Sequence, residues 1–161
     1  MAGPSCSVLS PRARVSDELV DDLVRLVGHE RDGNSFWVRD TRKVGGTYEG
    51  ERRPFVLFSE PRDEVDLRAM KEALGWAPLQ EIGLAAMCND AKDHRILGEM
   101  ALWLSEKLSG VVDLCGEIPE LDGQAARVAY QAAAGHTAYI SVADPEELRA
   151  WLASAAFRMV K

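Results

Sequence analysis

The chain has 161 residues and a formal net charge of −7, and 47% of its residues are hydrophobic. This length and composition suit one globular domain with its own core, and they argue against a disordered or low-complexity chain. Negative charge repels the phosphate backbone, so nucleic-acid binding is disfavoured, whereas a basic partner would be attracted. No apolar segment reaches the roughly 18 residues that a membrane-spanning helix requires.

The three cysteines, Cys6, Cys88 and Cys115, are far apart in the sequence and form no CxxC pair. An odd number of separated cysteines indicates reduced thiols in a cytosolic protein. The first residues contain no basic segment, and their apolar run is too short for a secretory signal. We therefore expect a cytoplasmic protein that has no membrane association and no cofactor.

Short strands and two amphipathic helices are predicted in the N-terminal half. The first helix, residues 16–28, begins with Ser16 as N-cap and ends at Gly28, and the second, residues 62–74, ends at Gly75. Residues 31–34 have the composition of a turn. Strands are expected at 7–10, 35–39, 53–59 and 80–88, although a helix is also possible for the last of these.

The C-terminal half contains the most clearly specified helix, residues 90–108, which Asp90 caps with Asp93 three positions later. A last helix begins at Asp144, and the apolar residues of segment 157–161 indicate a docked tail. Strands are expected at 111–115, 126–131 and 137–142. Residues 1–161 are therefore predicted to form a single α+β domain. We expect a mostly antiparallel or mixed sheet with about four helices packed on it.

An acidic segment is the first candidate for a functional site. Residues 111–126 contain no basic residue, and their acidic side chains are Asp113, Glu117, Glu120 and Asp122. These carboxylates could form a solvated loop or contact a basic partner. Asp113 and Glu117 could also serve acid–base catalysis or bind a divalent cation.

Tryptophan side chains offer a second candidate. Trp37, next to Arg39, is the tryptophan that best fits an exposed anchor for a partner. Trp103 and Trp151 lie on or beside apolar helix stripes, which favours core packing for both.

Two further motifs allow chemistry, although each has a simpler interpretation. His94 lies near Cys88, Asp90 and Asp93, so it could activate a thiol or help to bind a metal ion. The helix start already accounts for both aspartates, however, and His94 then becomes a surface residue. The segment 43–47, Lys-Val-Gly-Gly-Thr, lacks the spacing of a phosphate-binding loop and is interpreted as a flexible connection.

Two segments of the C-terminal half carry a family resemblance. They are His94–Gly98 continuing through Trp103 to Asp113, and Leu148–Leu152 leading to Phe157–Lys161. These segments resemble a family of small, uncharacterised actinobacterial proteins. The pattern is also similar to that of some immunity proteins of bacterial polymorphic-toxin systems, which are small, acidic, cytosolic α+β proteins. The resemblance implies no catalytic motif and no transferable functional residue.

These observations favour a non-enzymatic binding protein, and a toxin-neutralising immunity protein is the role that the resemblance suggests. We expect it to contact a basic partner through Trp37, Asp113, Glu117, Glu120 and Asp122. Two alternatives remain open. The first is a small enzyme that uses Cys88 with His94, or Asp113 with Glu117. The second is a homo-oligomeric structural module.

Overall fold

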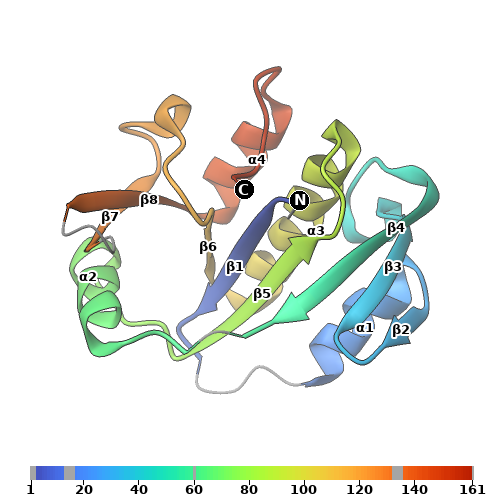
Figure 1. Ribbon diagram of the computed structural model, residues 1–161, viewed down its shortest axis with the longest axis horizontal. Helices are drawn as coiled ribbons and strands as arrows, with labels where there is room; N and C mark the ends of the chain where they lie inside the picture. The colour runs from blue at the N-terminus through green and yellow to red at the C-terminus, as the bar shows by residue number, and fades with distance from the viewer. Residues whose placement is uncertain (1–2, 13–16, 60, 132–135, 161) are drawn as a thin grey trace.

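A computed structural model describes residues 3–12, 17–59, 61–131 and 136–160 (Figure 1). Its strands are β1 (Ser5–Ser10), β2 (Glu30–Asp32), β3 (Ser35–Asp40), β4 (Glu49–Phe58), β5 (Gln80–Ala86), β6 (Val111–Asp113), β7 (Ala126–Gln131) and β8 (Thr137–Ala143). Its helices are α1 (Asp17–Val27), α2 (Glu64–Leu74), α3 (Ala91–Leu108) and α4 (Pro145–Ala153), with short 3-10 turns η1 (Arg42–Val44) and η2 (Pro119–Leu121).

All eight described strands join one sheet in the order β2-β3-β4-β5-β1-β6-β8-β7. Every neighbouring pair is antiparallel. The first strand, β1, therefore lies in the middle of the sheet, between β5 and β6. The prediction of a single α+β domain with an antiparallel sheet and about four helices is confirmed.

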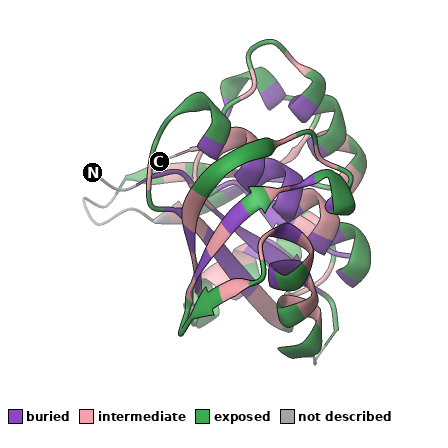
Figure 2. Cartoon of the chain, turned by 90° about the vertical axis from the view of Figure 1, so that its right-hand side faces the viewer, coloured by how far each residue is buried: buried purple, intermediate pink, exposed green. Residues whose placement is uncertain are grey.

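The helices are divided unequally between the two faces of the sheet. Val8 and Leu9 are neighbours in β1 and both are fully buried, so their side chains point to opposite faces. Val8 belongs to the large core cluster with residues of α1, α3 and α4. Leu9 packs instead with Met70 of α2 and with Val128 and Val142. Three helices thus cover one face, where most buried residues lie (Figure 2), and α2 packs on the other.

Local capping explains where α3 and α4 begin. Asp90 and Asp93 form a capping box at the start of α3, as the sequence predicts, and Asp144 and Glu147 form another at the start of α4. The helix α3 ends with Ser109 in the left-handed conformation, at φ 51°. Sequence signals near a helix end therefore locate its boundaries well here.

The described part of the C-terminal tail, which ends at residue 160, is docked as predicted. The backbone N–H of Ser5 donates to the carbonyl of Val160 at 3.1 Å. Met159 is buried, and the indole N–H of Trp151 donates to the carbonyl of Arg158 at 3.0 Å. The expected core position of Trp151 is confirmed, whereas Trp103 is half-buried at the edge of the core.

Several boundaries differ from the sequence prediction. Residues 30–32 form β2, where a turn was expected at 31–34, because β3 supplies a hydrogen-bonding partner that the local sequence does not reveal. The strand β4 begins at Glu49, four residues before the predicted start. The strands β5 and β6 end at Ala86 and Asp113, two residues earlier than expected. The proposed N-cap Ser16 lies outside the described residues.

Candidate functional site

The predicted acidic binding surface does not form as expected. Asp113 is 2% exposed and lies in the middle of the sheet, so it is not offered to a partner. Glu117 pairs with Arg127 at 2.5 Å, and Glu120 pairs with Arg158 at 2.7 Å. Asp122 is exposed and forms no ion pair with another described residue. These four carboxylates therefore do not form one exposed acidic surface, because Asp113 is buried and arginines from other elements pair with Glu117 and Glu120.

Trp37 lies far from this loop. It is half-buried in β3, and the guanidinium carbon of Arg52 lies 5.2 Å from the centre of its ring. Four strand spacings separate β3 from β6 in the sheet order, which corresponds to about 19 Å. Trp37 and Asp113 therefore do not belong to one compact patch.

His94 has a structural role that differs from both sequence interpretations. It is half-buried, and its Nδ1 accepts a hydrogen bond from the backbone N–H of Met159 at 3.0 Å. Its Nε2 lies 3.1 Å from Oδ1 of Asn89. Both ring nitrogens are thus occupied by structural contacts, which hold the tail against α3.

Two buried carboxylates on α3 fix neighbouring segments of the chain. Asp93 accepts hydrogen bonds from Arg53 of β4 at 2.7 and 2.6 Å. Glu99 accepts the backbone N–H of Thr47 at 2.9 Å and its hydroxyl at 2.8 Å, and it also accepts the hydroxyl of Thr41. The segment 43–47, expected to be a flexible connection, is therefore held by a carboxylate, which disfavours a phosphate at this loop.

A third polar cluster, besides those at Asp93 and Glu99, lines a hollow. This hollow, which we call the α2 pocket, has a volume of about 310 Å³ and lies on the α2 side of the sheet. Its lining residues are Ser7, Phe58, Pro61, Arg62, Asp66, Glu81, Asp113, Cys115, Tyr130 and Ile140. They come from six strands, from the segment before α2 and its first turn, and from the residues that follow β6, so only the folded chain brings them together.

Arg62 is the centre of this cluster. The sequence predicts that Arg62 starts this helix, but α2 begins at Glu64 with Asp63 as N-cap. Arg62 therefore precedes the helix. Its guanidinium donates to Glu81 at 2.8 and 3.3 Å and to Asp113 at 2.6 Å. The side chains of Arg62 and Glu81 are 15% and 12% exposed. One cation thus bridges two carboxylates at the wall of the α2 pocket.

The surroundings shift the proton affinities of two groups in the cluster. Burial raises the pKa of Asp113, and the ion pair with Arg62 and the N–H of Cys115, at 2.7 Å, oppose part of this shift. Desolvation of the thiol, and then the carboxylate of Asp113, raise the pKa of Cys115 to about 12, although part of the residue is exposed. Cys115 is therefore a protonated thiol at neutral pH and a poor nucleophile.

Charge and hydrogen-bonding capacity remain unused in the α2 pocket. The carboxylate of Asp66 is half-buried and forms no ion pair with a described residue. Ser7 is 2% exposed, and its hydroxyl forms no hydrogen bond with a described residue. No buried side-chain polar atom of the described part is closed off without a partner, so this hydroxyl is open to the hollow that it lines.

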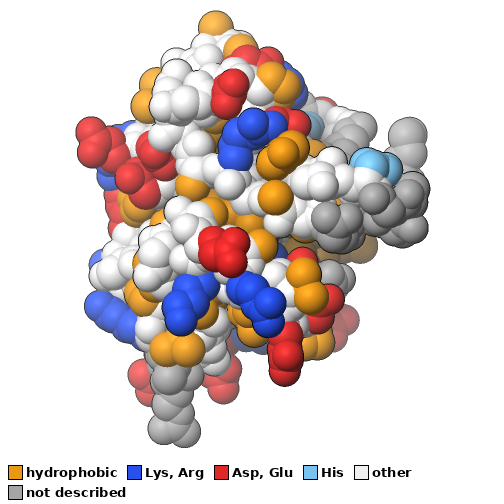
Figure 3. Space-filling view, turned by 90° about the vertical axis from the view of Figure 1, so that its left-hand side faces the viewer, with side chains coloured by type: hydrophobic (Ala, Val, Ile, Leu, Met, Phe, Trp, Pro, Cys, Tyr) orange, Lys and Arg blue, Asp and Glu red, His pale blue; other side chains and the backbone are white. Residues whose placement is uncertain are grey.

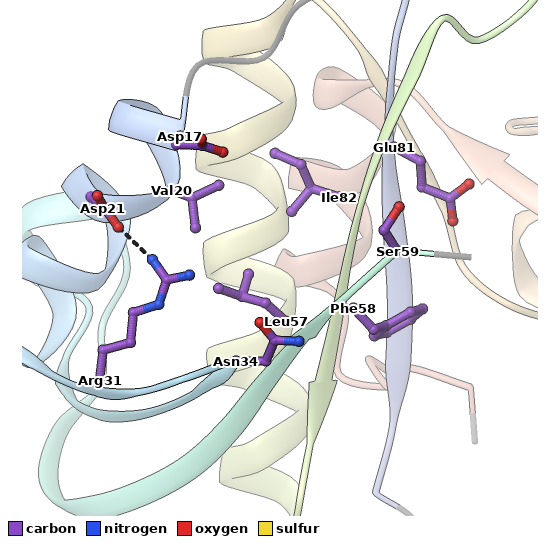
Figure 4. Close-up of a pocket in the computed structure, with 10 residues that line it drawn as sticks. All are labelled: Asp17, Val20, Asp21, Arg31, Asn34, Leu57, Phe58, Ser59, Glu81 and Ile82. Atoms are coloured by element: carbon purple, nitrogen blue, oxygen red, sulfur yellow. Dashed lines mark hydrogen bonds and ion pairs between the residues drawn. The ribbon is translucent and has the colours of Figure 1, made fainter. Parts of the chain in front are cut away.

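A second hollow, of about 460 Å³, lies on the other side of the end of β4 (Figure 4). It has a floor of Val20, Leu57 and Ile82, and Arg31 and Asp21 form an ion pair at its edge. Phe58 and Glu81 line both this hollow and the α2 pocket. The residues here are mainly apolar or already paired, so we place the candidate site in the α2 pocket.

Sequence reasoning identified Asp113 but missed Arg62, Glu81 and Ser7. In the sequence, Arg62 lies at a predicted helix start and Glu81 at a predicted strand start, where neither residue indicates a site. A weak signal existed, because Glu81 is a charged residue at the start of a largely apolar strand and Ser7 lies in the apolar run of β1. Their convergence depends on the sheet order, which no local pattern specifies.

The fold and this cluster define a class of protein: an antiparallel α+β domain with a charged hollow on the less-covered face of its sheet. Among the described residues, no helix is long and apolar enough to cross a membrane. No group of three or more His, Cys, Asp or Glu in the described part could hold a metal ion. The chain belongs to a family of unknown function, DUF6368, whose family model matches residues 2–161. Comparisons with curated proteins and with solved structures find no match.

Proposed function

We propose that this protein is a non-enzymatic binding protein whose basic protein partner docks on the α2 side of the sheet. The main support is that the helices leave part of this face uncovered. We call this part the open face. It is formed by half-buried side chains of β3, β4 and β5, namely Trp37, Pro54, Val56, Phe58 and Ala85. In Figure 1, α1 and α3 lie behind these strands.

The composition of the open face supports docking rather than solvation. Apolar side chains on the exposed face of a sheet are typical of a surface that another molecule covers. Met87 follows β5 directly and is 55% exposed, and its N–H donates to the carbonyl of Pro54 at 3.0 Å. Arg52 stacks on Trp37 and pairs with Glu30, so charged groups border the tryptophan, as a polar rim borders the apolar core of an interface.

The charge of the molecule supports a basic partner. The net charge is −7, which attracts a positively charged surface over several ångströms and raises the rate of encounter. Figure 3 shows, on the side that carries α2 and β7, hydrophobic side chains lying between acidic and basic ones.

The chemistry of the α2 pocket supports binding over catalysis. Arg62 is held by two carboxylates, and the thiol of Cys115 has a pKa of about 12, so neither is poised to act as an acid, base or nucleophile. The described residues that line this pocket include no histidine. An immunity protein that neutralises a basic toxin is the biological role that we propose for such a module.

The experiment measures the affinity of the purified chain for the proteins encoded beside its gene, by isothermal titration calorimetry. We expect one basic protein to bind, and Trp37→Ala to weaken binding by about tenfold or more, as for a central aromatic anchor. Trp103→Ala is the matched control, because Trp103 is also half-buried but lies on α3, behind the sheet. Equal losses in both variants, or no binding by any neighbour, contradict the proposal.

A further inference from the structure

The α2 pocket has an excess of negative charge that the fold itself does not use. Among the described residues that line it, three are carboxylates, Asp66, Glu81 and Asp113, and one is a guanidinium, Arg62. With these groups ionised, the pocket carries a formal charge of −2. The fold needs Arg62 to bridge Glu81 and Asp113, but Asp66 has no such partner among the described residues.

We propose that the α2 pocket binds an organic cation, the guanidinium or ammonium group at the end of an arginine or lysine side chain of the docked protein. This inference rests on the proposed function and names the chemistry of its contact. The pocket shares Phe58 with the open face, so a partner on that face can extend one side chain into the hollow.

Asp66 supplies the charge for this contact. It lies in the first turn of α2, and Asp63 accepts its backbone N–H at 2.9 Å, which fixes that turn beside the hollow. An incoming cation would give Asp66 an ion pair, as Arg62 already does for Glu81 and Asp113. An anion would meet this free carboxylate, and Arg62 is already engaged, so the pocket selects against negative ligands.

The remaining lining groups suit the body of a cationic side chain. The hydroxyl of Ser7 is open to the hollow, and a hydroxyl can accept a hydrogen bond from an N–H donor. Phe58 and Tyr130 contribute aromatic rings, whose faces attract cations when the two approach within about 6 Å. The volume of about 310 Å³ is at the lower end for small-ligand sites, which fits one side chain rather than a large cofactor.

The test uses N-acetyl-arginine amide as the probe, titrated into the ¹⁵N-labelled full chain and followed by NMR. N-acetyl-citrulline amide is the control probe, because it has nearly the same shape and no charge. We expect the arginine probe to shift the amide signals of Ser7, Asp66 and Tyr130 with a Kd on the order of 1 mM. The citrulline probe should leave these signals unchanged.

Two variants locate the contact. Asp66→Asn should weaken binding of the arginine probe by about fivefold, the effect of one charge pair near a surface. Glu72→Gln removes the same charge from an exposed position of α2 outside the pocket and should have no effect. Equal binding of both probes, or equal effects of both variants, would overturn the inference.

The affinity of the partner protein for the two variants Asp66→Asn and Trp37→Ala distinguishes this inference from the proposed function. If Asp66→Asn weakens the partner as it weakens the probe, the inference stands. If Trp37→Ala weakens the partner and Asp66→Asn does not, docking on the open face stands and the cation contact is wrong. The same conclusion holds if Asp66→Asn weakens only the probe, because the pocket would then accept free small cations and not the partner's side chain.

Discussion

Replacing Arg62 by glutamine should destabilise the protein strongly at neutral pH and much less in mild acid. Arg62→Gln removes the cation that bridges Glu81 and Asp113, whose side chains are 12% and 3% exposed. Removing one partner of a buried ion pair commonly costs 3–5 kcal/mol, because a buried charge is left uncompensated. Arg62 itself is 15% exposed at the wall of the α2 pocket, so we expect about 3 kcal/mol at pH 7.

The pH dependence follows from the carboxyl of Asp113. Burial already raises its pKa in the folded chain, and loss of Arg62 raises it further. A carboxyl with a raised folded pKa favours the folded state at low pH, and this contribution is lost as pH rises through the folded pKa. The cost of Arg62→Gln should therefore shrink as pH falls from 7 toward about 4, where an unfolded aspartate also becomes protonated.

The assay is urea unfolding of the wild type and the variant at pH 7 and pH 4.5, followed by circular dichroism. In thermal unfolding at pH 7, the same cost of about 3 kcal/mol corresponds to a decrease in Tm of roughly 6–12 °C for a domain of this size. The double variant Arg62→Gln with Asp113→Asn should recover part of the lost stability at pH 7. A cost below about 1 kcal/mol, or one that does not change with pH, refutes the reasoning.

Two further predictions concern other titrating groups. Burial of Asp93 raises its pKa, but hydrogen bonds from Arg53 and the backbone of Asp90 lower it more, so the net pKa lies below the usual range. Asp93→Asn should therefore lower the free energy of unfolding by about 3 kcal/mol in urea at pH 7. The difference between wild type and variant should disappear as the pH falls below about 4, and a difference that stays constant contradicts this assignment. The thiol of Cys115, with a pKa of about 12, should react with iodoacetamide at pH 8 at least about a hundredfold more slowly than an ordinary thiol. Peptide mass spectrometry measures this rate, and a rate that reaches its plateau near pH 9 speaks against the raised pKa.

Much of the secondary structure could be predicted because its signals are local. The capping aspartates of α3 and α4 lie within four residues of the groups that they bond, so the sequence alone shows them. The strand β2 is the opposite case. Its three residues, Glu-Arg-Asp, have no apolar alternation, and only pairing with β3 makes them a strand.

The candidate site was harder to predict, because its contacts connect distant parts of the chain. Arg62 meets Asp113 across 51 positions, and Arg158 meets Glu120 across 38. Composition showed that residues 111–126 are acidic, but it did not show which arginines would neutralise them. The hypothesis of a basic partner is kept here, while its contact moves from the acidic loop to the open face and the α2 pocket.

A crystal structure of the chain bound to its partner tests the central claim most directly. We predict that the partner covers Trp37 and Val56, and that one of its arginine or lysine side chains lies within hydrogen-bond distance of Asp66. A partner that docks on α1, α3 or α4 and leaves the open face exposed contradicts the account.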